Sequence, residues 1–213
     1  MRNPHIIVEG LDGAGKGEAI NTISRTLSAM GINYSPVREP GGTLLAESIR
    51  TEFKKQWKEV VAPETDIMMM YAARQQLYTN VIIPDRDRGV AIVQDRSWMT
   101  TFAYQVKGSG LVSTEFFWKF HNLIMEGKPQ PDLVIYLDIP PEVGFERIAK
   151  ARGDNSADRL ESYKKEFYEK ARAGYLDLAT SGTVPNMVVI NANRDIDDVT
   201  LDIMNAVINA VVK

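Results

Sequence analysis

Eight residues near the start of the chain, 10–17 (Gly-Leu-Asp-Gly-Ala-Gly-Lys-Gly), have the composition of a loop that binds phosphate groups. They directly follow the apolar run 5–9, which has the pattern of a buried strand. Glycines let backbone N–H groups approach a phosphate chain closely, and Lys16 supplies a positive charge for its terminal groups. The helix expected next points its positive end at the same place. These residues predict a nucleotide-binding loop; the alternative is a glycine-rich turn of another α/β fold.

One position of this loop departs from the usual pattern. A Ser or Thr normally follows the lysine and places its hydroxyl on Mg²⁺, whereas this chain has Gly17. The metal would then depend on phosphates, water and carboxylates, for which Asp95 and Glu18 are the candidates. The departure also leaves open a protein that binds nucleotides without catalysis.

Two further motifs follow the expected strands 33–37 and 90–94. The first, at 38–43 (Arg-Glu-Pro-Gly-Gly-Thr), combines a forked phosphate donor with a tight turn. The second, at 95–97 (Asp-Arg-Ser), supplies a carboxylate that could orient Mg²⁺ or its waters, and another arginine for phosphate. The alternatives are a plain turn with a surface arginine, and an aspartate that caps the next helix.

Side chains that could read a nucleobase occur on two expected helices. Arg74 lies in the helix at 64–82, on the face expected to lie above the strand ends. A buried guanidinium needs a partner, and a pyrimidine O4 oxygen, a phosphate or a structural carboxylate would each serve. Gln105 could line a base pocket, and Tyr104 could stack or exclude a hydroxyl. The run 68–70 (Met-Met-Met) is more typical of core or interface packing.

Arg147, Arg152 and Arg159 flank the most loop-like internal segment, residues 152–158. Arginines on a closing loop suit phosphoryl transfer, in which the charge of the moving group is neutralised and water is excluded. We therefore expect a lid at about 147–160. The alternative is a solvated basic face.

Composition excludes several classes of function. The 25 Lys and Arg against 28 Asp and Glu give a net charge of −3, so no broad basic surface indicates nucleic acid binding. Cysteine is absent, which excludes disulfides, a thiolate nucleophile and cysteine-based metal sites. We interpret His5 as a strand residue and His121 as a helix-surface residue, neither of them a metal ligand. Because no apolar stretch reaches the length of a membrane span, we expect a cytoplasmic protein without membrane association.

Strand-like and helical segments alternate along the chain, which predicts an α/β fold with a five-stranded parallel sheet and helices on both faces, in a single domain 1–213. Strands are expected near 5–9, 33–37, 90–94, 132–138 and 187–191. Helices are expected near 16–30, 43–56, 64–82, 98–106, 114–126, 141–151, 159–181 and 195–212. Ligands of such sheets bind beyond the carboxyl ends of the strands, where each motif above falls.

Taken together, these motifs resemble the thymidylate kinase family over essentially the whole chain. The resemblance rests on residues 9–16, 38–43, 71–74, 95–96, 103–105, 131–138 and 173–176. It is closest to the bacterial form, in which the lid rather than the phosphate loop carries the catalytic arginine. It implies a P-loop kinase fold, and transfer of the ATP γ-phosphoryl group to dTMP with Mg²⁺, giving dTDP and ADP. It also implies a homodimer, to which the helix at 64–82 would contribute.

The resemblance also implies roles for individual residues. Those expected to bind ATP are Gly10, Asp12, Gly13, Ala14, Gly15, Lys16, Gly17, Glu18 and Arg147, the last by stacking on adenine. Those expected to bind dTMP are Asp12, Arg38, Glu39, Pro40, Met70, Arg74, Arg96, Thr100, Tyr104 and Gln105. Those expected in catalysis are Lys16, Arg96, Arg152 and Arg159, with Asp95 at the metal. In the dTMP set, two arginines (38 and 96) would clamp the phosphate, the arginine at 74 would donate to thymine O4, and a cis bond would precede the proline.

Two residues besides Gly17 depart from the family pattern. Met70 stands where a phenylalanine usually stacks on thymine, and Ser97 stands where an aromatic ring or imidazole is usual. A thioether is more adaptable than an aromatic ring, so we hypothesise that the substrate extends beyond dTMP to dUMP or a 5-substituted pyrimidine. A deoxynucleoside kinase is the alternative enzyme. The turn at 38–43 instead favours an acceptor that carries a phosphate.

Overall fold

The computed structural model describes residues 3–152 and 165–212, and within them five parallel strands form one sheet in the order β2-β3-β1-β4-β5. The strands are β1 (His5–Gly10), β2 (Tyr34–Arg38), β3 (Ala91–Asp95), β4 (Leu133–Asp138) and β5 (Met187–Asn191). Each lies within one residue of its expected bounds. The expected α/β class with a parallel sheet is therefore confirmed.

Helical segments connect the strands. They are α1 (Lys16–Ala29), α2 (Leu44–Lys54), α3 (Pro63–Leu77), η1 (Tyr78–Ile82), α4 (Ile83–Asp87), α5 (Trp98–Thr101), η2 (Phe102–Gly108), α6 (Thr114–Met125), α7 (Pro141–Arg152), α8 (Lys165–Thr180) and α9 (Ile196–Val212). Two predictions were incomplete, because the helices expected at 64–82 and 98–106 pass into the wider π-helical segments η1 and η2. Such segments are frequent at functional sites and have no simple sequence signature. Of the helix expected at 159–181, residues 159–164 lie outside the described residues.

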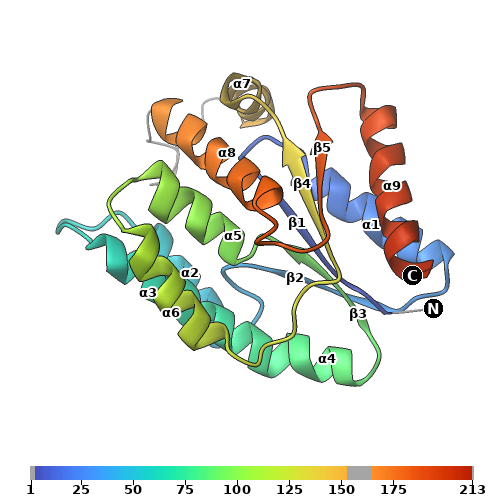
Figure 1. The fold of residues 1–213 in the computed structure, drawn as a ribbon, viewed down its shortest axis with the longest axis horizontal. Coiled ribbons are helices and arrows are strands. Elements are labelled where there is room, and N and C mark those ends of the chain that lie inside the picture. The colour runs from blue at the N-terminus through green and yellow to red at the C-terminus, as the bar shows by residue number, and fades with distance from the viewer. Residues whose placement is uncertain (1–2, 153–164, 213) are drawn as a thin grey trace.

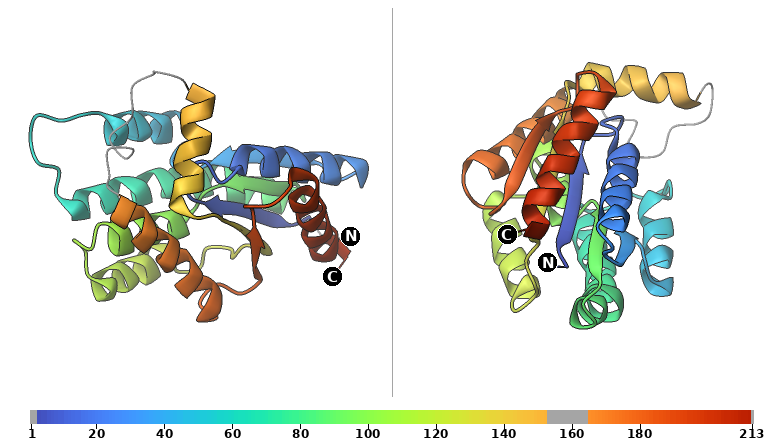
Figure 2. Two further views of the ribbon diagram at one scale, coloured as in Figure 1. Left: turned by 90° about the horizontal axis from the view of Figure 1, so that it is seen from above. Right: turned by 90° about the vertical axis from the view of Figure 1, so that its right-hand side faces the viewer.

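The sheet separates two apolar cores, because alternate residues of a strand point to opposite faces. Ile6 and Val8 of β1 pack with α1 and α9 on one face, whereas Ile7 packs with α3, α5, α6 and α8 on the other. Figure 1 shows α1 and α9 on one side of the strands and α3, α5, α6 and α8 on the opposite side. Figure 2 gives the same arrangement from two further directions. The central strands β1, β3 and β4 are thus covered on both faces, as the continuous apolar runs of β3 and β4 predicted.

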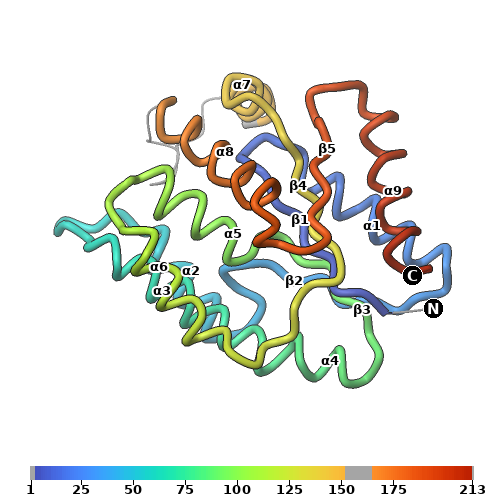
Figure 3. Tube along the Cα trace, viewed as in Figure 1, coloured from blue at the N-terminus to red at the C-terminus, as the bar shows by residue number. Residues whose placement is uncertain are grey.

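Helix α7 crosses the carboxyl ends of the strands beside the glycine-rich loop, as the trace in Figure 3 shows. The contact between loop and helix requires glycine on both sides. A Cβ atom at Gly13 would lie 2.4 Å from the carbonyl oxygen of Gly144, and one at Gly144 would lie 2.5 Å from the carbonyl oxygen of Asp12. Gly13 also has a φ of +79°, which side-chain-bearing residues rarely adopt. This close contact fixes α7 against the loop.

Candidate active site

The predicted motifs at 10–17, 38–43 and 95–97 lie at the carboxyl edge of the sheet. Parallel pairing places Arg38 at the end of β2 opposite Asp95 at the end of β3, and Gly10 at the end of β1 opposite Leu137 of β4. Segments far apart in sequence therefore converge on the same edge, where ligands of open α/β sheets bind.

Lys16 opens α1 and turns back over the glycine-rich loop. Its ammonium group donates to the carbonyl oxygens of Gly10 at 3.1 Å and Leu11 at 2.9 Å, and lies 3.8 Å from the carboxylate of Asp12. Burial, together with the charge of Arg96, lowers the pKa of Lys16 to about 8, although Asp12 opposes the shift. The ammonium group is thus held by backbone carbonyls, and a bound anion would stabilise its charge.

Gly17 faces open space one residue further along α1. A Cβ atom built there would meet no heavy atom of the described residues within 4 Å, so a hydroxyl side chain would fit. The neighbouring Glu18 pairs with Arg25 at 3.4 Å. No side chain of the described residues therefore fills the space that a Ser or Thr hydroxyl at position 17 would occupy.

A cavity of about 500 Å³ opens beside the loop, between α1, α7 and α9. Arg147 forms part of its wall and is held by two carbonyl oxygens, donating to Gly13 at 3.4 Å and to Ala192 at 2.9 Å. Much of the remaining wall is apolar and includes Ile196 and Ile203 of α9. Sequence reasoning missed these α9 residues, because an apolar helix face gives no sign of whether it packs on the core or borders a cavity.

Arg96 occupies the centre of the site. Its backbone has a φ of +65°, and its guanidinium forms an ion pair with Asp12 and donates to Thr100 Oγ1 at 3.3 Å. The guanidinium also lies 5.5 Å from the ring centroid of Tyr104, whose hydroxyl donates to Asp12 at 3.4 Å. Burial raises the pKa of Asp12, but the charges of Arg96 and Lys16 outweigh this effect and lower it. The structure thus brings together four of the predicted site residues.

The turn after β2 contains the expected cis peptide bond between Glu39 and Pro40. Arg38 forms an ion pair at 2.8 Å with Glu47 of α2, which also accepts a hydrogen bond from the backbone of Gly42 at 2.8 Å. Glu47 thus fixes both the turn and its arginine. Sequence reasoning missed Glu47, although an acidic residue in the first turn of the next helix was visible there.

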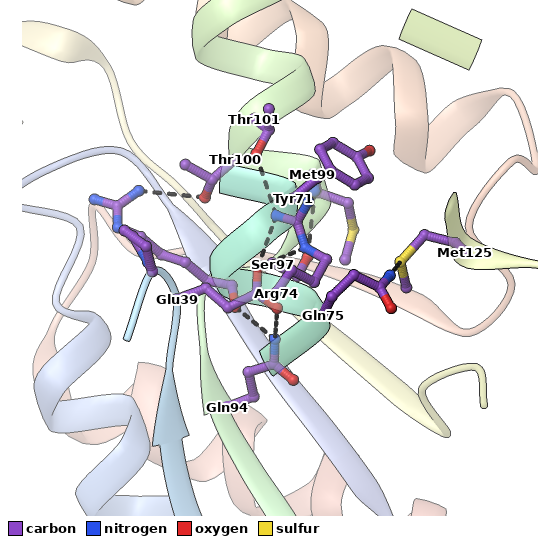
Figure 4. Close-up of polar contacts among 12 residues, drawn as sticks. Glu39, Tyr71, Arg74, Gln75, Gln94, Ser97, Met99, Thr100, Thr101 and Met125 are labelled. Carbon is purple, nitrogen blue, oxygen red and sulfur yellow. Dashed lines mark hydrogen bonds and ion pairs between the residues drawn. The ribbon is translucent and has the colours of Figure 1, made fainter. Parts of the chain in front are cut away.

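Arg74 is 2% exposed, and its principal partner is the structural carboxylate that the sequence had left open (Figure 4). Its Nε and Nη2 atoms both lie 2.7 Å from Glu39 Oε2, and Nη2 also donates to Thr101 Oγ1 at 3.2 Å. The guanidinium lies 4.3 Å from the ring centroid of Tyr71, and Met70 is buried one turn earlier. The remaining Nη1 atom is buried without a hydrogen-bond partner among the described residues. A buried donor without a partner is costly, so it indicates a place for a ligand acceptor.

Asp95 provides a second buried atom of this kind. Its Oδ1 atom has no hydrogen-bond partner among the described residues, although it lies at the end of β3, next to Arg96. An unpaired carboxylate oxygen at this edge suits a cation or its bound water. No cluster of three or more His, Cys, Asp or Glu side chains that could hold a metal occurs in residues 3–152 and 165–212.

A buried carboxylate that sequence reasoning did not use supports this centre. Glu9 accepts hydrogen bonds from Ser97 Oγ and Thr100 Oγ1, each at 2.6 Å, and from the hydroxyl of Tyr175 at 3.0 Å. Burial raises the pKa of Glu9, and the two shorter hydrogen bonds oppose this shift. Ser97 therefore packs as a hydrogen-bond donor. An acidic residue at the end of an apolar strand was the available signal.

Other predicted residues have more peripheral surroundings. Gln105 is buried and, with Tyr104, lines a pocket of about 250 Å³ below the 56–63 loop. Arg152 is the last residue of α7, and Arg159 lies outside the described residues, as does most of the expected lid. The prediction that His121 lies on a helix surface was wrong. It is 9% exposed and 2.7 Å from the Tyr71 hydroxyl, because α6 turns this face toward α3.

The parallel sheet and the glycine-rich loop with its lysine define the class of the molecule as a P-loop kinase. The family model described as thymidylate kinase matches residues 8–203. A thymidylate kinase of Alteromonas mediterranea is 41% identical over 211 residues, covering 99% of this chain and 92% of the relative. Those of Pseudoalteromonas translucida and Idiomarina loihiensis are 42% and 39% identical, covering 96% and 97% of this chain and 95% and 98% of the relatives. The chain belongs to the thymidylate kinase family. None of the described helices is long and apolar enough to cross a membrane.

Proposed function

We propose that the protein transfers the γ-phosphoryl group of ATP to dTMP, giving dTDP and ADP. The identity of the phosphoryl acceptor rests on Arg74. Glu39 fixes its guanidinium, and its Nη1 donor has no partner among the described residues. A pyrimidine O4 atom is an acceptor that would satisfy this donor. The 4-amino group of cytosine is itself a donor and would not satisfy it. The site therefore suits a thymine or uracil base.

The remaining acceptor contacts follow from the same edge of the sheet. We assign the monophosphate to Arg38 and Arg96, and the deoxyribose to Asp12 and Tyr104, whose carboxylate and ring lie beside Arg96. The remaining members of the acceptor set are Glu39, Pro40, Met70, Thr100 and Gln105. Asp12 already pairs with Arg96, so an incoming phosphate would compete with this carboxylate for the guanidinium.

The donor nucleotide is assigned to the other half of the edge. The loop residues 10–18, with Lys16, would bind the triphosphate, and Arg147 would stack on adenine at the wall of the cavity. The positions of Arg152, at the end of α7, and Arg159 in the sequence support a role in neutralising the transferred group. No covalent intermediate is needed, because positioning and charge neutralisation account for such a reaction.

Mg²⁺ fits this site in a particular way. When bound, it would neutralise charge on the phosphates. The unpaired Oδ1 atom of Asp95 would hold the ion or one of its waters. The hydroxyl that usually assists is replaced by Gly17, so phosphates and water would supply most of the ligands.

The whole chain, residues 1–213, is proposed to act as a single kinase domain and to form a homodimer. The surface proposed for dimerisation combines α3 and α6, which contact one another where Gln75 donates to the Ile124 carbonyl oxygen at 3.0 Å. Met68 on α3 and Leu123 on α6 are 51% and 70% exposed, as apolar side chains at an interface between copies would be before association.

A coupled assay of ADP release with Mg²⁺ and ATP tests the function, with dTMP and thymidine as alternative acceptors. We expect ADP release that depends on dTMP and none that depends on thymidine. Release with thymidine alone would identify a deoxynucleoside kinase, and nucleotide binding without turnover would identify a binding protein. In the same assay, dUMP and 5-hydroxymethyl-dUMP test the breadth that Met70 suggests. A preference for dTMP above about 200-fold, the upper range for one methyl group, would contradict that breadth.

A further inference from the structure

Gln94, the penultimate residue of β3, is fully buried and connects two parts of the acceptor site. Its amide nitrogen donates to Glu39 Oε1 at 2.9 Å and to the backbone carbonyl oxygen of Arg96 at 2.9 Å. Figure 4 shows its side chain pointing from the strand toward Glu39 and the helix that carries Arg74. The proposed function assigns no role to this glutamine.

The chemistry of its neighbours determines how the amide is oriented. A carboxylate and a carbonyl oxygen can only accept hydrogen bonds, so the group that faces them must be the NH₂ group. The amide oxygen then faces the Nε2 atom of His5 at 2.7 Å, and that nitrogen must carry the proton. Burial lowers the pKa of His5 to about 4, so the imidazole is neutral near pH 7. The histidine and the glutamine therefore have one arrangement in which every contact joins a donor to an acceptor.

This arrangement completes the coordination of Glu39. One carboxylate oxygen binds the Gln94 amide, and the other binds two nitrogens of the Arg74 guanidinium. With both oxygens engaged, the carboxylate cannot rotate without breaking a hydrogen bond. The direction of the unpaired Arg74 Nη1 donor is consequently set by Gln94, two contacts away.

The same NH₂ group acts on the phosphate side of the site. Arg96 has a left-handed backbone conformation, which is unfavourable for a residue with a side chain and needs support from its surroundings. The hydrogen bond from Gln94 to the Arg96 carbonyl oxygen supplies part of that support. The backbone of Arg96 in turn determines where its guanidinium meets Asp12.

We propose that Gln94 is a positioning residue that sets base selectivity by fixing the Glu39–Arg74 pair and, through the Arg96 backbone, aligns it with the phosphate-binding arginine. This inference rests on the proposed function for the identity of the acceptor. It goes further in assigning selectivity to a residue that would not touch the substrate.

Gln94→Met tests the inference, because methionine has similar length but no amide. His5→Phe is the matched control. It removes the partner of the Gln94 amide oxygen, but the Gln94 amide nitrogen keeps its contacts with Glu39 and with the Arg96 carbonyl oxygen. We expect Gln94→Met to raise the KM for dTMP about tenfold and to reduce the preference for dTMP over dCMP by a similar factor. The KM for ATP should change by less than about twofold, because the side chain of Gln94 has its hydrogen bonds with His5, Glu39 and Arg96, none of which belongs to the donor loop. His5→Phe should change the dTMP parameters by less than about threefold.

A second variant guards against a failure to fold. Gln94→Asn keeps the amide but withdraws it by one methylene, so that it no longer reaches Glu39, and it should reproduce the loss of base preference. The NMR signal of the Arg74 Nε–H group reports the network without any substrate. Its exchange with water should be slow in the parent and in His5→Phe, and about tenfold faster in both Gln94 variants.

Two results would overturn the inference. One is an unchanged dTMP preference in the folded Gln94 variants, and the other is slow Arg74 Nε–H exchange in those variants. If the parent itself does not phosphorylate dTMP, the proposed function fails, and the exchange measurement alone decides whether Gln94 positions Arg74.

Discussion

The charged groups of the donor and acceptor halves of the site are held by different kinds of contact. In the donor half, backbone carbonyl oxygens hold two of the cations, with Lys16 bound by Gly10 and Leu11 and Arg147 bound by Gly13 and Ala192. In the acceptor half, side chains hold one another, as in the buried pair Glu39–Arg74 and the half-buried pair Asp12–Arg96. Backbone groups are present whatever the sequence, whereas a side-chain network fails when one member is lost. A substitution in the acceptor half should therefore affect both selectivity and stability, whereas a substitution in the donor half should affect catalysis without lowering stability.

The largest expected effect is on stability in the acceptor half. Glu39→Gln keeps the size of the side chain but leaves the buried Arg74 guanidinium without its counter-ion, which should lower the free energy of unfolding by about 3–5 kcal/mol. Urea denaturation measures this loss. The matched control is Glu47→Gln, which removes an exposed carboxylate paired with Arg38 and should cost less than about 1 kcal/mol. Equal losses in the two variants would show that the buried pair contributes no more to stability than the exposed one.

The next largest expected effect is a loss of catalysis without a loss of stability, in the donor half. Lys16→Met should reduce kcat/KM about 10²–10³-fold, because a preorganised charge at the phosphates is lost. The midpoint of urea denaturation should stay level or rise, since burial disfavours the charge of this lysine and lowers its pKa to about 8. Arg25→Met, on the exposed side of α1, serves as the control and should leave both quantities nearly unchanged. A destabilised Lys16→Met protein would remove the distinction between the halves.

The smallest expected effect concerns Gly17, which stands where a Ser or Thr hydroxyl is usual. Gly17→Thr should lower the Mg²⁺ concentration required for half-maximal rate about three- to tenfold, because the side chain has room and adds one oxygen ligand. A magnesium titration of the ADP-release assay measures it. Gly17→Ala is the matched control, since it raises helix stability by about 0.5–1 kcal/mol without adding a ligand. Equal shifts of the titration in both variants would show that the threonine hydroxyl does not act as a magnesium ligand.

The fold and the position of the glycine-rich loop could be predicted from the sequence because their signals are local. The alternation of strands and helices, the apolar runs of β3 and β4, and the loop at 10–17 each lie within one short segment. Local signals have limits even here. The helix expected at 64–82 passes into η1 after Leu77, and its π-helical winding depends on tertiary packing rather than on residue type.

The acceptor half could be predicted only as a set of residue types. Arg74 was predicted to need a partner, but its partner Glu39 is 35 residues away in sequence, and Gln94 is 55 residues from Glu39. Such contacts exist only once the strand order is known. His121 was predicted to lie on a surface for the same reason. The helix pattern shows that the side chain is polar, but it does not show that the Tyr71 hydroxyl forms a hydrogen bond with it.

The order of the strands has a consequence for synthesis. β1 is made before both of its neighbours in the sheet, which are β3 and β4. At about 5–20 residues per second, the ribosome completes the start of β3 roughly 4–17 s after the start of β1. During that interval the apolar segment Ile6-Ile7-Val8 has no strand partner and only α1 beside it in sequence. The loop proposed to bind phosphate is thus made well before the strands and the helix that surround it, and it reaches its final surroundings only after they are made.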